Sequence, residues 1–162
     1  MAYNIIEANL DDVAHSKAIL TLLNAYACDI MGGGESLSEY VQENLIDELS
    51  KRSDVLIVLA YDDGKPIGLA ISFEGFSTFY AQPLLNIHDF VVIPEYRRKG
   101  VAKLILEKIE SISKQRNYCK LTLEVLEGNV RAQKVYKDFG FASYVLDDQM
   151  GRGLFFDKKL HH

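Results

Sequence analysis

Hydrophobic and polar residues alternate along this chain with two different periods, which together predict a mixed α/β fold. Apolar runs and period-2 alternation are typical of strands, whereas apolar residues three or four positions apart are typical of helices. Strands are expected at residues 3–8, 55–61, 66–76, 84–92, 119–126, 142–145 and 153–160. Helices are expected from Asp11 or Asp12 to Tyr26, from Ser36 or Ser38 to Leu49, from Val101 to Ile112 and from Asn129 to Gly140.

The connections between these segments predict the kind of sheet. Residues 62–65 (Asp-Asp-Gly-Lys) are typical of a tight hairpin, while the helix after residue 100 requires a crossover. We therefore expect a mixed, mostly antiparallel central sheet of about six to seven strands, flanked by about four helices. No repeat or linker divides the sequence, so residues 1–162 are interpreted as one domain. His161 and His162 are set aside, because a terminal histidine pair is also typical of a purification tag.

Composition and charge disfavour nucleic acid, membranes and metals as partners of this protein. The formal net charge of −5 disfavours non-specific nucleic-acid binding, because no basic stripe extends beyond residues 97–103. No apolar run reaches the ~18 residues of a membrane helix, and the acidic N-terminus lacks the features of a signal peptide, so no membrane partner and a cytoplasmic location are expected. Cys28 and Cys119 have apolar neighbours and no ligand-like spacing, which favours buried free thiols and no metal site.

Residues 90–102 run from an apolar strand through a basic turn into an amphipathic helix. The first backbone N–H groups of such a helix have no partner within it, and together with the helix dipole they attract phosphate. Positive charge is concentrated at the same place by Arg97, Arg98, Lys99 and Lys103. Gly100 allows a ligand to approach the backbone closely. The turn is therefore predicted to hold a pyrophosphate.

The same turn belongs to a recognisable pair of motifs. Residues 97–102 follow the pattern Arg/Gln-x-x-Gly-x-Gly/Ala, and downstream Asn129 opens a predicted helix that contains Tyr136 and ends at Phe139-Gly140-Phe141. Both motifs resemble those of the GCN5-related N-acetyltransferase (GNAT) superfamily. The resemblance implies the GNAT fold and an enzyme that transfers an acetyl group from acetyl-coenzyme A to a primary amine. Transfer would proceed by direct attack in a ternary complex, without a metal.

The resemblance also implies where the cofactor binds. Backbone groups of Val91 and Val92 would bond the pantetheine arm like an added strand, beside a bulge that separates two strands. Amides of residues 98–103 would hold the pyrophosphate, Asn129 would contact the pantetheine end, and Tyr136 would protonate the departing sulfur. The implied cofactor-binding set is Val91, Val92, Arg97, Arg98, Lys99, Gly100, Val101, Ala102, Lys103, Asn129 and Tyr136.

The general base is a separate question, because the acceptor amine must lose a proton. Strand alternation is expected to put Asn86 and His88 on one face and Ile87 and Asp89 on the other. Members of the family often carry a glutamate or histidine base at the positions that Asn86 and His88 occupy. An asparagine cannot serve, whereas a histidine titrates near neutral pH, so His88 is the preferred base. Asp89 is interpreted as a carboxylate for the cationic acceptor, a partner of a neighbouring group or an alternative base.

Glu124 and Glu127 are further options for the base. The acceptor itself is expected to meet Asp29, Glu35, Phe73 and Asp89, because the family builds this site from its first two helices and the facing sheet. Carboxylates among aromatic residues suit a small ammonium compound, such as a polyamine or an amino-acid-like amine.

Other functions and states stay open. A protein or peptide amine is an alternative acceptor, and a non-catalytic acyl-coenzyme A sensor is an alternative function. A P-loop is disfavoured, because Gly100 is not followed by Lys-Ser/Thr. The run Gly32–Gly34 is either a lid hinge or a helix break. Members of the family are often homodimers, but no segment of this chain demands it.

Overall fold

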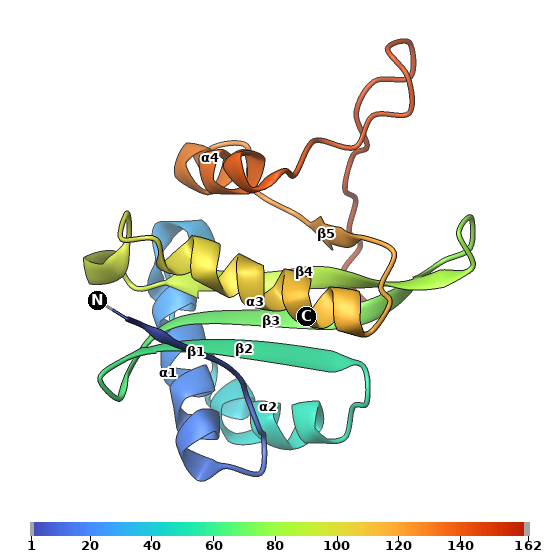
Figure 1. The fold of residues 1–162 in the computed structure, drawn as a ribbon. Coiled ribbons are helices and arrows are strands. Elements are labelled where there is room, and N and C mark those ends of the chain that lie inside the picture. The colour runs from blue at the N-terminus through green and yellow to red at the C-terminus, as the bar shows by residue number, and fades with distance from the viewer. Residues whose placement is uncertain (1, 161–162) are drawn as a thin grey trace. The chain divides into compact units, whose positions relative to one another are not determined.

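A computed structural model describes residues 2–160 and confirms the mixed α/β architecture, so the histidines set aside above lie outside the described residues. Its first compact unit, Met1–Asn129, carries most of the elements (Figure 1). They are β1 (Asn4–Glu7), α1 (Val13–Cys28), the 3₁₀ turn η1 (Ile30–Gly32), α2 (Glu39–Ser50), β2 (Val55–Asp62), β3 (Lys65–Ser77), β4 (Gln82–Val92), the 3₁₀ turn η2 (Pro94–Tyr96), α3 (Val101–Gln115) and β5 (Leu121–Leu123).

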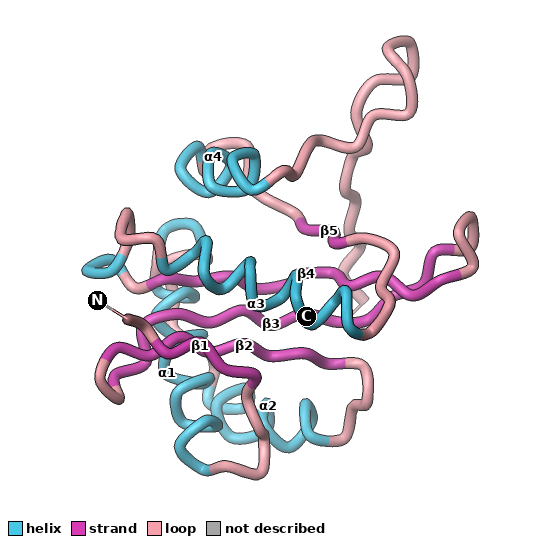
Figure 2. The backbone as a smooth tube through the Cα atoms, in the orientation of Figure 1, coloured by secondary structure: helices cyan, strands magenta, loops and turns pink. Residues whose placement is uncertain are grey.

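The second compact unit, Val130–His162, contains α4 (Val130–Phe139). Gly140 follows the helix with φ of +111°, as expected of a residue that ends a helix. The strands expected at residues 142–145 and 153–160 are wrong: the described part of this segment makes only one isolated bridge, between Val145 and Arg152. Strands need a partner along their length, and these residues are drawn as loop in Figure 2.

The sheet of the first unit has five strands in the order β1-β2-β3-β4-β5, so the expected six to seven strands are too many. Neighbouring strands are antiparallel except for β4 and β5, which are parallel and joined through α3. The sequence predicts this mixture correctly, because tight turns connect β2 to β3 and β3 to β4 while a helix must carry the chain from β4 to β5.

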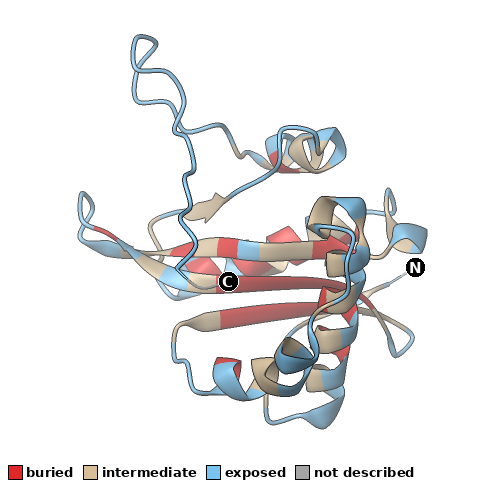
Figure 3. Ribbon diagram, turned by 180° about the vertical axis from the view of Figure 1, so that it is seen from behind, coloured by how far each residue is buried: buried red, intermediate tan, exposed pale blue. Residues whose placement is uncertain are grey.

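Two helical layers cover the sheet, whose central strands are its most buried part (Figures 1 and 3). On one face, α1 and α2 pack through Leu22 and Leu49 against Ile71 and Val91. On the other face lies α3, whose Ile105 is buried. The side chains of Asp12 and Ser38 cap α1 and α2, as the sequence predicts.

Cysteine burial is a further correction. Cys28 is exposed, because it ends α1 beyond the residues that pack on the sheet, whereas Cys119 is half-buried; both are free thiols. Among residues 2–160, no helix combines the length and apolarity needed to span a membrane.

Candidate active site

The candidate site begins where β4 and β5 part. The two strands pair only over three positions, from Leu85 with Leu121 to Ile87 with Leu123. At the middle position the Asn86 side-chain amide donates a hydrogen bond of 2.9 Å to the Thr122 hydroxyl, which fastens the strands just before they separate. Beyond Ile87, the remaining residues of β4 have no pairing with β5. At this strand edge, the family resemblance implies that Val91 and Val92 bond a pantetheine arm.

A β-bulge at His88 rearranges the faces of β4. Asp89 pairs with Ile71 of β3, but the next residue of β3, Ser72, pairs with Ile87, so His88 is an extra residue on β4. Paired residues share a face, and Ile71 belongs to the core beneath α1 and α2. Asp89 therefore lies on the α1 and α2 face, whereas Ile87 lies on the α3 face.

The bulge makes the expected separation of residues 86 and 89 wrong. Asn86 pairs with Phe73, which also packs on the α1 and α2 face. The His88 ring lies 5.6 Å from the Phe73 ring in an edge-to-face arrangement, which puts it on the same side. Simple alternation fails here because the extra residue shifts the period by one. The fold thus brings His88, Asp89 and Phe73 together.

This shared face is acidic and partly shielded from water. Burial raises the pKa of Asp89 above its ordinary value, although His88 partly opposes the shift. The pKa of Tyr26 on α1 is raised as well, first by burial and then by the nearby charges of Asp89 and Asp29. Among residues 2–160, no lysine or arginine forms an ion pair with Asp89. The carboxylate is therefore available to a cation from outside the chain.

A nearby arginine, Arg52, already has partners within the chain. Arg52 lies over the Phe73 ring, 5.4 Å from its centre, and makes two hydrogen bonds of 2.9 and 2.7 Å to the Asp54 carboxylate. Arg52 and Asp54 therefore compensate each other's charge.

The turn between η2 and α3 has the backbone expected of an anion site. Arg98 and Gly100 both adopt the left-handed conformation, with φ of +63° and +82°. Gly100 is the N-cap of α3, and no side chain caps the helix. The amides of Val101, Ala102 and Lys103 belong to the first turn, where the helix itself supplies no acceptor. A Cβ added at Gly100 would meet nothing within 4 Å, so the space beside Gly100 itself is open.

The basic side chains of the turn have more specific contacts than the sequence predicts. The Arg97 guanidinium donates to the Val92 carbonyl oxygen (2.9 Å) and pairs with Asp29 (3.0 Å). The Lys99 ammonium lies over the Tyr96 ring, 5.1 Å from its centre. Lys103 pairs loosely with Glu107, at 3.7 Å. Arg98 is exposed.

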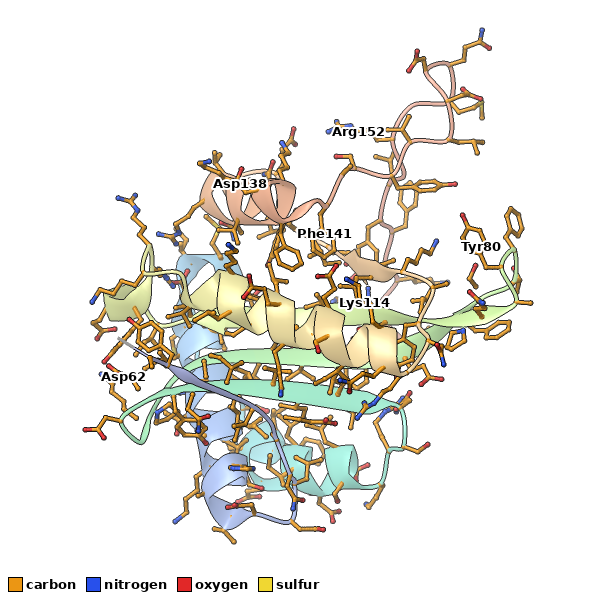
Figure 4. All side chains as sticks on the ribbon, in the orientation of Figure 1. Asp62, Tyr80, Lys114, Asp138, Phe141 and Arg152 are labelled. Atoms are coloured by element: carbon orange, nitrogen blue, oxygen red, sulfur yellow. The ribbon has the colours of Figure 1, made fainter. Side chains whose placement is uncertain are left out.

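Two contacts of the turn could not be predicted from sequence spacing, because the partners are far apart in the chain. One is the pair of Arg97 with Asp29. The other is the Tyr96 hydroxyl, which donates to Asp62 over 2.8 Å and so ties the turn to the β2–β3 hairpin (Asp62 is labelled in Figure 4). The first contact ties the turn to the end of α1, and the second ties it to the sheet.

The remaining candidates come from other segments of the chain. Glu35 is exposed in the loop before α2, and Glu124 and Glu127 are exposed after β5. Asn129 is half-buried at the end of the first unit. Tyr136 belongs to the second unit, where it is 8% exposed and its ring lies 5.9 Å from that of Phe141. Their roles stay predictions. Residues 2–160 contain no group of three His, Cys, Asp or Glu side chains placed to hold a metal.

The forked strands and the uncapped helix are the features by which the chain can be compared with known families. The pattern of the acetyltransferase (GNAT) family matches residues 19–141, most of the chain. The chain belongs to this family. The match includes the turn, the bulged strand and α4, so the resemblance seen in the sequence is confirmed.

Curated relatives are distant and matched in part. A thialysine N-epsilon-acetyltransferase from Bos taurus is 30% identical over 74 residues, 46% of this chain and 43% of the relative. An uncharacterized N-acetyltransferase from Archaeoglobus fulgidus is 30% identical over 58% of this chain and 65% of its own length. The matches thus span less than two thirds of these relatives. An aminoglycoside N(6')-acetyltransferase type 1 from Acinetobacter haemolyticus is 24% identical over 78% of this chain and 83% of its length.

Solved structures share the fold. An aminoglycoside acetyltransferase from an uncultured soil metagenomic sample, in complex with sisomicin, superposes with a TM-score of 0.80 at 14% identity, over 98% of this chain and 97% of its own. The AAC(6')-Iy enzyme in complex with a coenzyme A bisubstrate analogue gives a TM-score of 0.75 at 18% identity, over 98% and 99%. At these identities the likeness supports the GNAT fold alone.

Proposed function

We propose that this protein is an acetyl-coenzyme A-dependent N-acetyltransferase that acts on a primary amine of a small molecule. One observation carries the proposal: an uncapped helix start with open space at Gly100 follows directly on a bulged strand that has parted from its neighbour. The first feature suits a diphosphate and the second suits an extended arm. Coenzyme A has both groups in this order.

The residues present fit the cofactor. The amides of residues 98–103 would bind the diphosphate, with the helix dipole and Arg98 adding favourable charge. The edge of β4 at Val91 and Val92 would hold the pantetheine arm, and a backbone N–H near Val92 would stabilise the carbonyl oxygen as it gains charge. Bound acetyl-coenzyme A would supply a thioester, whose carbonyl carbon is open to attack by an amine.

The acidic face of β4 would receive the amine. A primary amine has a pKa of about 10.4 and arrives protonated, so it must be attracted as a cation and then lose a proton. Asp89 would attract the ammonium group, since no lysine or arginine of the described chain is paired with it. His88 would accept the proton, and its exposure allows it to pass the proton on to water.

Bond changes then balance as follows. The neutral amine nitrogen forms a bond to the thioester carbonyl carbon, and the carbon–sulfur bond breaks. The leaving sulfur would take a proton, which Tyr136 would supply in line with the family motif. The acetylated nitrogen would release its excess proton to water, and Tyr136 would recover a proton from water. The Tyr136→Phe variant tests this role: kcat should fall by about 10²–10⁴-fold while the affinity for coenzyme A stays unchanged. A normal kcat would remove Tyr136 from the chemistry.

The nature of the acceptor follows from the charge of the face. A half-buried carboxylate beside Phe73 and Tyr26 suits a compact cation with an apolar body, such as a polyamine or an amino-acid-like amine. Some relatives bear names that point to small amines, thialysine and aminoglycosides. A protein or peptide amine stays the alternative acceptor.

Thiol release from acetyl-coenzyme A, followed with a panel of amines, tests the function. The panel contains thialysine, sisomicin, spermidine, lysine and a lysine-containing peptide. We expect release with at least one small amine and weaker release with the peptide. Tight coenzyme A binding without release by any amine would favour the sensor module instead. Release by the peptide alone would favour a protein acceptor.

A further inference from the structure

Arg97 contacts two parts of the site that are far apart in the sequence, the end of β4 and the end of α1. Its Nε donates to the carbonyl oxygen of Val92, the last residue of β4, at 2.9 Å. Its Nη2 lies 3.0 Å from Oδ2 of Asp29, at the end of α1. One guanidinium thus bridges the strand that leads into the cofactor turn and the loop between α1 and α2.

Asp29 in turn organises the loop at residues 29–34, which we name the acceptor loop. Its Oδ1 accepts from the Met31 amide at 3.0 Å, and its carbonyl oxygen accepts from the amides of Gly32 (2.9 Å) and Gly34 (3.0 Å). Its own amide donates to the carbonyl groups of Ala25 and Tyr26 on α1. A displacement of Asp29 would therefore displace the whole acceptor loop.

The ion pair is more shielded than a surface pair. The Arg97 and Asp29 side chains are 24% and 23% exposed, whereas those of Arg116 and Glu7, which form another pair, are both 42% exposed. Partial burial reduces screening by water and salt, so the Arg97–Asp29 pair is expected to interact more strongly than an exposed pair. Its contribution depends on both segments holding their positions.

We propose that Arg97 is a positioning residue that couples cofactor binding to the acceptor loop. This inference rests on the proposed function, since it takes coenzyme A as the ligand of the turn. A diphosphate held by the amides of residues 98–103 orders the turn and with it the backbone that carries Arg97. An ordered Arg97 holds Asp29 more firmly, so the acceptor loop becomes ordered before the amine binds. By linkage, an ordered loop also favours cofactor binding.

Amide hydrogen exchange, measured by mass spectrometry with and without saturating coenzyme A, tests the coupling. In the wild type, coenzyme A should slow exchange of the acceptor loop by about fivefold, at the low end of typical coupling. Asp29→Asn keeps an oxygen for the Met31 amide but removes the charge, and Arg97→Gln removes the bridge. In either variant, coenzyme A should no longer slow exchange of the acceptor loop, so the ratio of the rates without and with coenzyme A should be about one. Calorimetry should still detect binding of coenzyme A to both variants.

Arg116→Gln is the matched control, because it breaks an ion pair elsewhere in the first unit and should keep the wild-type response. If the ion pair is purely structural, breaking it in either variant would speed exchange of the acceptor loop equally with and without coenzyme A. That result would overturn the coupling. Protection that persists in Asp29→Asn would overturn it too. If calorimetry detects no coenzyme A binding to the wild type, the proposed function itself fails and the coupling with it.

Discussion

Two regions of the site are built in opposite ways: the turn that we propose binds the cofactor (residues 97–103, the cofactor turn) and the face of β4 that we propose binds the amine (His88, Asp89 and Phe73 with Tyr26 of α1, the acceptor face). The turn is contiguous, residues 97–103, and acts through backbone groups that one helix start aligns. The face combines side chains from α1, β3 and β4, and its composition depends on one extra residue at position 88. A contiguous backbone site can be found from a short motif. A face assembled from distant side chains needs the register of the sheet.

This difference has a functional counterpart. Any ligand with a diphosphate meets the same amides, so the turn can stay constant while the acceptor changes. The acceptor face can change by single substitutions on three elements without disturbing the turn. Variants at the two places should therefore separate cofactor affinity from amine turnover.

Gly100→Val should abolish detectable coenzyme A binding and hence all activity. A left-handed backbone costs an L-residue roughly 1–2 kcal/mol, and the new side chain would also fill the open space beside Gly100, where we propose that the ligand approaches the backbone. Calorimetry with coenzyme A measures the loss. Gly128→Ala is the control, since an added Cβ there meets nothing within 4 Å and it should bind normally. Retained binding in Gly100→Val would rule out the turn as the diphosphate site.

His88→Ala should lower kcat/KM for the amine by about 10²-fold or more and leave coenzyme A affinity unchanged. The loss should be greatest where the amine is still protonated but an imidazole is neutral, and it should shrink at low pH, because a protonated imidazole cannot act as a base. A pH–rate profile on both proteins measures this. A profile with the same shape and height as the wild type would assign the base to Asp89 or to a glutamate.

Asp89→Asn should raise KM for a cationic amine by about tenfold, a loss of roughly 1.4 kcal/mol, without affecting cofactor affinity. In the wild type, acceptor binding should weaken as pH falls through the raised pKa of Asp89, and thus at higher pH than for an ordinary aspartate. Steady-state kinetics against pH measures both effects. An unchanged KM would mean that the ammonium group binds elsewhere.

Asp89→Asn should weaken amine binding but stabilise the folded protein. Because burial raises the pKa of Asp89, its ionised form is disfavoured in the folded protein, and the penalty is present above that raised pKa. Asp89→Asn should therefore increase the free energy of unfolding at pH 7, with a vanishing difference below pH ~3.9, where the carboxyl is neutral in both states. Urea unfolding at the two pH values measures it. A less stable variant at pH 7 would show that the carboxylate stabilises the fold.

Gly32→Ala should destabilise the acceptor loop by roughly 1–3 kcal/mol. A Cβ there would lie 1.9 Å from the Tyr26 carbonyl oxygen, so the loop would have to move off the end of α1. Thermal unfolding and the KM for the amine should both change, whereas coenzyme A affinity should change only as far as the coupling through Arg97 requires. Wild-type stability would show that the loop does not pack against α1.

Ser72→Ala should raise stability by about 1 kcal/mol and leave activity unchanged. Its hydroxyl is fully buried on the α3 face and has no hydrogen-bond partner among the described residues, so a methyl group removes an unsatisfied polar atom. Ser77→Ala is the matched control, since its buried hydroxyl accepts from the Tyr80 amide and its loss should destabilise. Equal effects of the two variants would contradict this account.

Local signals in the sequence predict much of the fold. The caps Asp12 and Ser38 mark the starts of α1 and α2, and the turn at residues 62–65 sets the β2–β3 hairpin. The turn at Gly100 is predicted for the same reason, because its chemistry lies in adjacent residues. The two C-terminal strands are predicted wrongly, since their apolar residues resemble strands but find no partner among the described residues.

The acceptor face could be predicted only in part. His88 and Phe73 lie on one face, as their shared role requires, and their roles stay predictions. The position of Asp89 depends on the bulge, which the family resemblance implies but the residue pattern of β4 does not locate. The Arg97–Asp29 pair joins residues 68 positions apart, and only the fold brings them together. Side chains that meet through tertiary structure leave no periodic signal along the chain.

The central claim is that backbone amides at the start of α3 hold the diphosphate of coenzyme A. Amide chemical shifts of the isotope-labelled protein, titrated with coenzyme A and in parallel with pantetheine, test it directly. We predict large shifts at residues 98–103 with coenzyme A only, and shifts at Val91 and Val92 with both ligands. Coenzyme A that leaves the amides of residues 98–103 unchanged would contradict the account.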